Sequence, residues 1–290
     1  MRLSGITFVK DAIKFDFPIK EVISSMLPIC DEVYANIGVS EDDTLELVNS
    51  IDDPKLKVFE TEWDPDFKAK GRILAVQTNI PLYKCRGDWV LYLQGDEVLH
   101  EDDYDAILAT LDKYKDDHRV EGFLFDYYHF FGDHNHYARS YHWYKQEIRI
   151  IRNHLGIQSW RSAQSFRVDG RKLRVKRMPA TIYHYGWVRD PHKMAVKKKY
   201  HDSLHHGDSD EKAPEKLEFS EFIDPYMLAE YKGSHPAAVK ERVENWKYPF
   251  DPAKNPRKLS LKDMKYRVLD FIDYRTGIRI GEYRNFKLIK

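Results

Sequence analysis

Two adjacent acids, Asp96 and Glu97, follow a short apolar run of residues 89–93 that is bounded by Gly87 and Gly95. Such a run between two turns is typical of a buried strand. In open α/β sheets, ligands collect beyond the carboxyl ends of such strands. Carboxylate oxygens suit Mg²⁺ or Mn²⁺, so we predict that both acids bind a metal ion. The alternative is a charged turn that leads into an acidic helix start.

The same residues carry a family resemblance. The stretch 89–97, Trp-Val-Leu-Tyr-Leu-Gln-Gly-Asp-Glu, resembles the acidic motif of family 2 glycosyltransferases, which usually reads Asp-x-Asp-Glu after a central strand. The resemblance implies the GT-A fold, an α/β nucleotide-binding sandwich, and inverting transfer of a sugar from a nucleotide-sugar with Mn²⁺ or Mg²⁺. It also implies that Gln94, Gly95 and Asp96 contact the donor, with Gln94 in the place of the family's first Asp.

A second strand end, residues 32–44, resembles the family's second-strand loop, which usually reads Val-Asp-x-Gly-Ser-x-Asp-x-Thr. That resemblance implies that Val9 and Asp11 lie near the base, and that Asn36 and Asp42 lie near base and ribose. A turn followed by a capping box accounts for the same loop without any ligand.

A basic segment at residues 68–72 precedes a helix that Pro81 interrupts. The family often has a basic residue and an Asn on this segment, so the resemblance implies that Arg72 and Asn79 contact the donor. A cation near the free amides of a helix start suits a diphosphate. A solvated charge is the alternative.

His184 ends an apolar strand within residues 180–191. In the family, a His in this place can join the metal, so the resemblance implies that His184 is a metal ligand. Arg189 is expected to contact the diphosphate, and Lys193 and Lys197 are further candidates on the helix that follows. A structural, hydrogen-bonding histidine is the alternative.

Sugar transfer with inversion needs a general base, which in this family is nearly always a carboxylate. The expected acceptor segment, residues 158–166, has none. We therefore predict Glu147 or Asp169, which flank it, as the catalytic base, with Asp126 and Asp133 as alternatives.

An aromatic, His-rich loop spans residues 129–144. His134 and His136 alternate, but no helix-fixed pair completes a zinc site. Aromatic residues that face an acceptor sugar, and ordinary packing, are the other two interpretations of this loop.

The elements that position these residues alternate as strand and helix. Strands are predicted at residues 6–9, 33–37 and 55–61, with helices between them. This β-α-β-α-β pattern predicts a mainly parallel central sheet flanked by helices.

We expect a GT-A-like domain over residues 1–206, with a donor half at about 1–100 and an acceptor half at about 101–206. A mostly helical extension follows at residues 207–290. The weakly alternating tail of this extension could pair at a sheet edge or with another subunit, so an oligomer is one of the expectations.

Composition excludes several classes of protein. The 290 residues carry 47 basic and 47 acidic side chains, which gives no bulk attraction to nucleic acid. No run approaches the roughly 20 apolar residues of a membrane span, so contact with a lipid-linked acceptor would be peripheral, at the inner face of the membrane. The two cysteines, Cys30 and Cys85, form no disulfide framework, which favours the cytoplasm.

Together these patterns predict a metal-dependent inverting glycosyltransferase. Its partners would be a nucleotide-sugar donor and a glycan or lipid-linked saccharide acceptor in surface polysaccharide synthesis. One alternative is a donor- or glycan-binding module that has lost catalysis. The other is a metal-dependent nucleotidyltransferase, although no Gly-rich phosphate loop follows the first strand.

Overall fold

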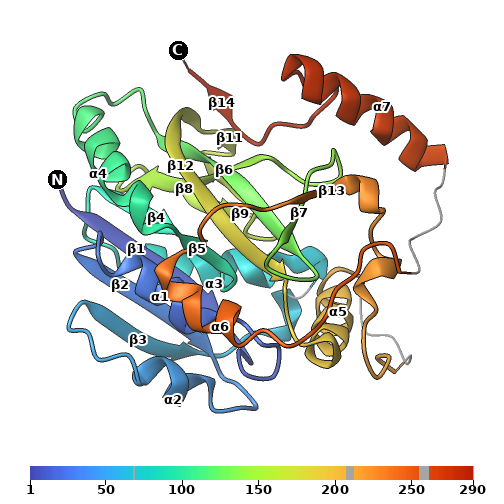
Figure 1. Cartoon of the computed structure of the whole chain (residues 1–290). Coiled ribbons are helices and arrows are strands. Elements are labelled where there is room, and N and C mark those ends of the chain that lie inside the picture. The colour runs from blue at the N-terminus through green and yellow to red at the C-terminus, as the bar shows by residue number, and fades with distance from the viewer. Residues whose placement is uncertain (68, 207–211, 255–260, 290) are drawn as a thin grey trace.

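A central β-sheet with helices packed on it forms the body of the computed structural model (Figure 1). The structure describes residues 1–67, 69–206, 212–254 and 261–289. The strands of this sheet are β1 (Leu3–Val9), β2 (Glu32–Gly38), β3 (Leu56–Thr61), β4 (Trp89–Tyr92), β5 (Glu97–Leu99), β6 (Gly122–Phe131), β7 (His136–Ala138), β8 (Gln146–Arg152), β12 (Arg174–Trp187), β13 (Leu228–Glu230) and β14 (Lys287–Leu288).

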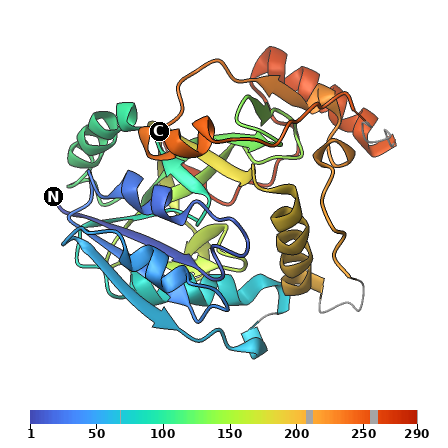
Figure 2. The ribbon, with the colours of Figure 1, turned by 60° about the horizontal axis from the view of Figure 1, so that its bottom comes forward.

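The helices are α1 (Ile19–Met26), α2 (Thr44–Asn49), α3 (Arg72–Leu82), α4 (Tyr104–Lys113), α5 (Pro191–His206), α6 (Lys240–Glu244) and α7 (Leu261–Thr276). A small antiparallel sheet joins β9 (Gln158–Trp160), β10 (Ser165–Val168) and β11 (Arg171–Lys172). Seen from below, α5 stands at the side of the molecule, away from the N-terminus (Figure 2).

The sheet has a parallel half and an antiparallel half. Strands β3, β2, β1 and β4 run parallel in that spatial order, and β8 and β6 continue the sheet antiparallel. The predicted α/β class with a mainly parallel central sheet flanked by helices is therefore confirmed. The parallel half brings the carboxyl ends of β1, β2 and β4 to one edge, where ligands collect in such sheets.

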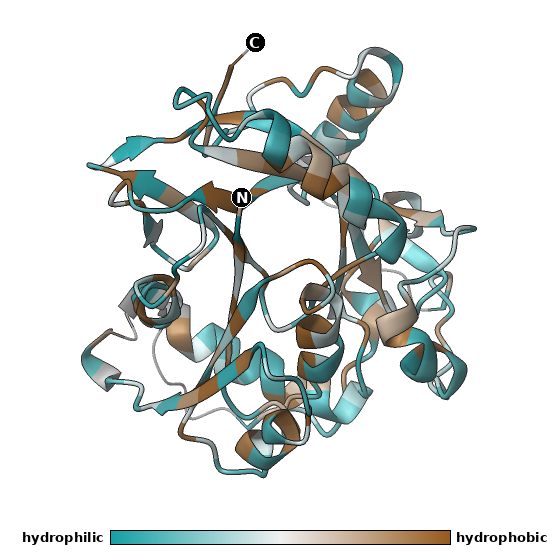
Figure 3. Ribbon diagram, turned by 90° about the vertical axis from the view of Figure 1, so that its left-hand side faces the viewer, coloured by the Kyte–Doolittle hydropathy of each residue, from teal (hydrophilic) through white to brown (hydrophobic). Residues whose placement is uncertain are grey.

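Strand β4 lies at the centre of the protein because both of its faces are covered. Trp89 and Leu91 point into one core, which includes Ile19, Ile23 and other residues of α1. Val90 and Tyr92 point into the other core, which Leu82 of α3 joins. This alternation is what a fully buried strand requires. In Figure 3, hydrophobic residues run along the strands in the middle of the molecule, whereas α7 shows bands of both colours.

Strand β12 connects the acidic motif to the rest of the sheet. It pairs antiparallel with β5, where His184 lies opposite Glu97, and parallel with β6, where His184 lies beside His129. The chain after β4 therefore turns, presents Asp96 and re-enters the sheet at Glu97 as the first residue of β5.

The segment after residue 211 packs against the sheet rather than standing apart from it. Strand β13 pairs with β7, and β14 pairs with β12. Leu217, Phe219 and Ile223 join a third apolar cluster with Phe131. In the described residues this segment thus combines strands with α6 and α7, and the boundary at residue 206 stays a prediction. No helix in the described part of the chain combines the length and apolarity that crossing a membrane needs.

Candidate active site

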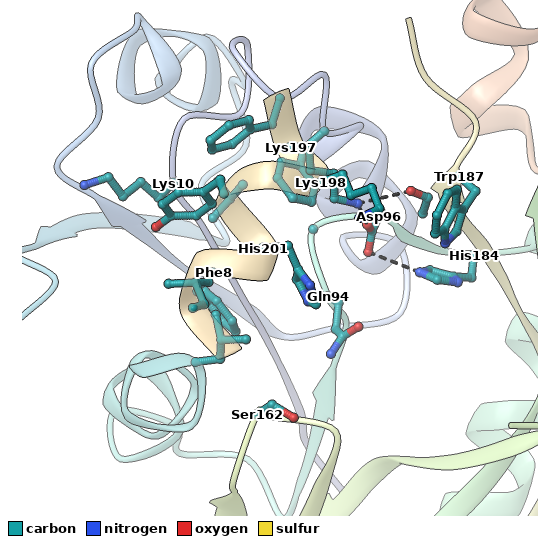
Figure 4. Close-up of a pocket in the computed structure, with 18 of the residues that line it drawn as sticks. Phe8, Lys10, Gln94, Asp96, Ser162, His184, Trp187, Lys197, Lys198 and His201 are labelled. Atoms are coloured by element: carbon teal, nitrogen blue, oxygen red, sulfur yellow. Dashed lines mark hydrogen bonds and ion pairs between the residues drawn. The ribbon is translucent and has the colours of Figure 1, made fainter. Parts of the chain in front are cut away.

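A cavity of about 510 Å³ opens beyond the carboxyl ends of β1 and β4, against α5 (Figure 4). The predicted site residues that line it are Val9, Gln94, Gly95, Asp96 and His184. They come from three separate strand ends, and β12 brings His184 back to the acidic motif from 88 residues further along the chain. The sheet topology therefore assembles the core of the predicted site.

Asp96 is surrounded by cations although it is 7% exposed. Its Oδ2 accepts hydrogen bonds from Arg189 at 2.6 Å and from Lys197 at 3.2 Å, and its Oδ1 lies 3.5 Å from His184 Nε2. Burial alone would raise the pKa of Asp96, but the charges of Lys197 and Arg189 hold that pKa well below its ordinary value. Asp96 is thus a fixed negative charge in the cavity wall.

A chain of hydrogen bonds orients the ring of His184. His129 Nε2 lies 2.8 Å from the carbonyl oxygen of Tyr144, so it must carry a proton and donate it there. Burial lowers the pKa of His129, so its ring is neutral and its Nδ1 accepts. His184 Nδ1, at 2.8 Å from His129 Nδ1, must then be the donor. In a neutral His184 this leaves the Nε2 lone pair facing the cavity.

The space between Asp96 Oδ1 and His184 Nε2 suits a cation. Two acceptors 3.5 Å apart repel one another unless a proton or a metal ion lies between them. A histidine whose other ring nitrogen is held by a hydrogen bond is the usual form of a metal-ligating histidine. The described residues contain no cluster of three or more His, Cys, Asp or Glu that could hold a metal. The protein side of such a site would therefore consist of these two groups.

Glu97 does not join this site, so the prediction that it binds metal does not fit the structure. Asp96 lies in the turn before β5 and lines the cavity, whereas Glu97, the first residue of β5, is not part of the cavity lining. Its Oε2 accepts from Arg149 Nε at 2.6 Å, its Oε1 accepts from Arg149 Nη2 at 2.7 Å, and both side chains are fully buried. Tyr127 donates a third hydrogen bond to Oε1 at 3.0 Å.

Arg189 also lies behind the cavity wall rather than in it. Its side chain is fully buried, and besides Asp96 it donates to the carbonyl oxygens of Phe15 and Gly186. Burial lowers its pKa to about 10. Arg189 is not part of the cavity lining, and its hydrogen bond at 2.6 Å fixes Asp96.

Asn36 and Asp42, which are predicted to contact the donor, form hydrogen bonds within the protein. Asn36 is fully buried and bonds to Gln77 and Thr61. Asp42 accepts from the backbone N–H groups of Lys14 and Thr44. These contacts support the turn interpretation of this loop.

Arg72 and Asn79 likewise lie outside the cavity lining. The guanidinium of Arg72 lies 5.8 Å from the ring centre of Phe67. Asn79 accepts a hydrogen bond from the backbone N–H of Ser159 at 2.8 Å, which holds α3 to the β9 region. Neither residue lines the cavity, and their contact with a donor stays a prediction.

Asp11 lies in an adjoining cavity of about 210 Å³. This cavity shares Lys10, Trp63 and Tyr200 with the larger one. The Oδ1 of Asp11 accepts from the backbone N–H of Glu41 at 2.8 Å. Asp11 thus holds the second-strand loop against the end of β1 and lies where an extended ligand could reach it.

Neither predicted base lines the cavity. Glu147 is 3% exposed, and burial raises its pKa to about 7. Asn285 donates to its Oε1 at 3.3 Å, and its Oε2 has no hydrogen-bond partner among the described residues. Asp169 lies in the exposed turn between β10 and β11 with φ 48°.

Helix α5 contributes more side chains to the cavity lining than the sequence predicts. Lys197, Lys198 and His201 line the cavity from this helix, and Lys10 lines it from the end of β1. Burial lowers the pKa of Lys197 to about 7, with Arg189 adding to the effect. His201 follows Lys197 by four residues and Lys198 by three, and this spacing indicates that these side chains lie on one side of the helix.

Comparisons with known proteins found likenesses among solved structures alone: no family model and no curated protein matches the chain. Residues 1–349 of S. aureus TarS match at 14% identity and TM-score 0.39, over 70% of this chain and 65% of that one. The same fragment in complex with UDP matches at 21% identity and TM-score 0.34, over 45% and 36% of the two chains.

Glucosyl-3-phosphoglycerate synthase from Mycobacterium tuberculosis, in complex with Mn²⁺, UDP and phosphoglyceric acid, matches at 16% identity and TM-score 0.30. That match covers 44% of this chain and 43% of the synthase. This chain thus spans less than two thirds of each of these three structures. With TM-scores below 0.5, the likenesses do not bear on its activity.

Proposed function

We propose that this protein transfers a sugar, with inversion, from a nucleoside diphosphate sugar to a hydroxyl group of a saccharide. The observation that carries the proposal is the cluster of Asp96, His184 and Lys197 in the wall of the 510 Å³ cavity, beyond the carboxyl end of β4. The cluster combines one fixed carboxylate with groups that attract phosphate oxygens.

Asp96 Oδ1 and His184 Nε2 would hold Mn²⁺ or Mg²⁺ in this proposal. Such ions commonly bind through one or two protein groups and complete their coordination with substrate phosphates and water. When bound, the ion would supply Lewis-acid stabilisation of the departing diphosphate. Arg189 and His129 keep the two protein ligands in place.

The lysines of the lining would neutralise the same leaving group. Lys10, Lys197 and Lys198 place three amino groups on the cavity. Fixed cations aimed at a developing charge act more strongly where water is excluded. Lys197 already lies 3.2 Å from Asp96 Oδ2, so its position is set before a donor binds.

Aromatic side chains offer a place for the nucleoside. Phe8, Trp63 and Tyr200 lie on the part of the lining next to Lys10. The rings of Phe8 and Trp63 are 6.0 Å apart between centres. Flat aromatic faces stack on nucleobases, which supports a base at this end of the cavity.

Among the described residues of the lining, Asp202 is the carboxylate that remains for the acceptor proton. Its side chain is 51% exposed and pairs with Lys198 at 2.6 Å. Asp96 is a poor proton acceptor because its cations hold its pKa well below the ordinary value. In our proposal Asp202 takes the role that we had predicted for Glu147 or Asp169.

The test is a screen of nucleoside diphosphate sugars for release of the diphosphate in the presence of Mn²⁺ and oligosaccharides. We expect turnover of at least one donor, loss of turnover in Asp96→Asn and Asp202→Asn, and normal turnover in Asp112→Asn, an exposed aspartate on α4. Binding of a donor without any turnover would instead support a non-catalytic binding module. Release of pyrophosphate from a nucleoside triphosphate and a sugar phosphate would support a nucleotidyltransferase.

A further inference from the structure

A second cavity, of about 300 Å³, lies between β6, the loop after β7 and α7. Aromatic rings dominate its lining: Tyr127, Tyr137, Trp143, Tyr144, Phe271 and Tyr274. Phe271 is 57% exposed and Tyr274 is 70% exposed, although large apolar rings normally pack away from water. The guanidinium of Arg139 lies 4.9 Å from the ring centre of Tyr274, and that of Arg275 lies 5.5 Å from the ring centre of Phe271. Each of these exposed rings therefore has one remaining face that a ligand could cover.

The polar groups of this second cavity are mainly acidic. Asp126, Asp270 and Asp273 line it, against the cations Arg139 and Lys145. Lys145 is already paired with Asp273 at 2.6 Å. A ligand that carries phosphates would meet more negative than positive charge here, which distinguishes this cavity from the lysine-rich one.

Asp270 has an acceptor that the described residues leave unused. Its Oδ1 accepts from the backbone N–H of Tyr141 at 2.6 Å. The hydroxyl of Ser140 lies near the carboxylate, but the buried Oδ2 makes no hydrogen bond of normal geometry among the described residues. A buried acceptor without a donor costs free energy unless a ligand or water supplies one. A hydroxyl group is a donor that a carboxylate at this position can accept.

The second cavity adjoins the first through one layer of side chains. Tyr144 lines both cavities. His129 lines the second cavity and is hydrogen-bonded at 2.8 Å to His184, which lines the first. The two cavities thus share a wall, and a saccharide bound in the second cavity would have to extend past Tyr144 to present a hydroxyl group to a donor in the first.

We propose that the second cavity binds the saccharide acceptor, as an uncharged sugar held between aromatic faces and the carboxylates of Asp126 and Asp270. A sugar ring offers both an apolar face and several hydroxyl donors, which is the combination that this lining accepts. The identification of this sugar as the acceptor rests on the proposed function. The binding of a neutral saccharide does not.

The test uses the full-length protein on an array of neutral and acidic oligosaccharides, followed by calorimetric titration with the neutral oligosaccharide that binds best. Phe271→Ala and Tyr274→Ala should each weaken binding about tenfold or more, because an aromatic anchor is lost. Both side chains are more than half exposed, so these variants should fold. Tyr283→Ala, at an exposed tyrosine outside both cavities, is the matched control and should bind normally.

The proposal is overturned if no neutral oligosaccharide binds, if acidic glycans bind better, or if the two α7 variants bind as the wild type does. Nucleoside diphosphates are titrated separately on the same proteins, and their affinity should be equal in wild type and Tyr274→Ala. If a saccharide binds in a way that depends on Tyr274 and no nucleotide binds, the second cavity is a sugar site. In that case only the proposed function is refuted.

Discussion

Asp96 and Glu97 are chemically similar neighbours whose surroundings make them act differently. Asp96 faces the cavity among cations, whereas Glu97 is fully buried against Arg149. The sequence could predict the position of Asp96 because the end of a central strand is where ligands collect. It could not predict the ion pair of Glu97, because Arg149 lies 52 residues away and only the folded sheet brings it to Glu97.

Because Glu97 holds Arg149 in the core, its loss should affect stability directly. Glu97→Gln leaves a buried guanidinium without its counter-ion, which costs about 3–5 kcal/mol in comparable cases. The free energy of unfolding, measured by urea denaturation, should fall by that amount. The double variant Glu97→Leu/Arg149→Met should recover much of it. A loss below about 1 kcal/mol in the single variant would contradict this structural role.

Glu147 gives the chain a pH-dependent stability, because burial raises the pKa of its carboxyl to about 7. Between about pH 4.3, the ordinary value, and pH 7 the unfolded chain binds fewer protons at this site than the folded chain. The contribution of Glu147 to the free energy of unfolding is therefore fully present below about pH 4.3 and falls as the pH rises to 7.

We expect Glu147→Gln to remove this slope and to be more stable than the wild type by about 3 kcal/mol at pH 8. Urea midpoints between pH 4.5 and 8 measure the effect, with Glu46→Gln on the surface of α2 as the control. Parallel pH profiles for wild type and Glu147→Gln would contradict it.

At the scale of elements, the pairing of β6 with β12 decides the geometry of the site. The register places His129 beside His184, and this neighbour in turn fixes which nitrogen of His184 faces Asp96. Two strands 55 residues apart in the sequence cannot be aligned from their patterns alone, because a slip of one residue would turn each side chain to the other face.

His129 should therefore act as a positioning residue for His184. We expect His129→Phe to weaken Mn²⁺ binding, in the presence of a nucleoside diphosphate, by about tenfold or more, since partners of this kind typically contribute that much. Electron paramagnetic resonance of free Mn²⁺ gives the affinity without any need for turnover. His118→Phe, in the surface turn after α4, is the control. Equal Mn²⁺ affinities in wild type and His129→Phe would refute the role.

Strong local patterns predicted the elements themselves well. Strands β1, β2, β3 and β4 and helices α1, α3 and α5 lie where periodicity and turn residues predict them. The helix start at α2 differs, because α2 begins at Thr44 and its N-cap Asp43 makes no side-chain capping bond. The carboxylate of Asp42 and the hydroxyl of Ser40 instead hold the end of β1, through Lys14 and Asp11.

At the scale of the whole molecule, two cavities share one wall of side chains, and local sequence patterns could not predict this arrangement. The mostly helical extension that the sequence predicts includes α7, on which Met264 and Val268 are 59% and 60% exposed. Phe271 and Tyr274 of the same helix instead border the second cavity. Which face of α7 meets the sheet depends on contacts such as Tyr141 with Asp270, between residues 129 positions apart.

The central claim is that Asp96 and its neighbours bind a nucleoside diphosphate together with a divalent cation. The most direct measurement is the melting temperature with UDP, GDP and other nucleoside diphosphates, each with and without Mn²⁺, for wild type, Asp96→Asn, His184→Asn and Asp112→Asn. We predict that at least one nucleotide raises the melting temperature of wild type and of Asp112→Asn when Mn²⁺ is present, and that Asp96→Asn and His184→Asn lose the increase. An equal increase in all four proteins, or no increase with any nucleotide, would contradict the account.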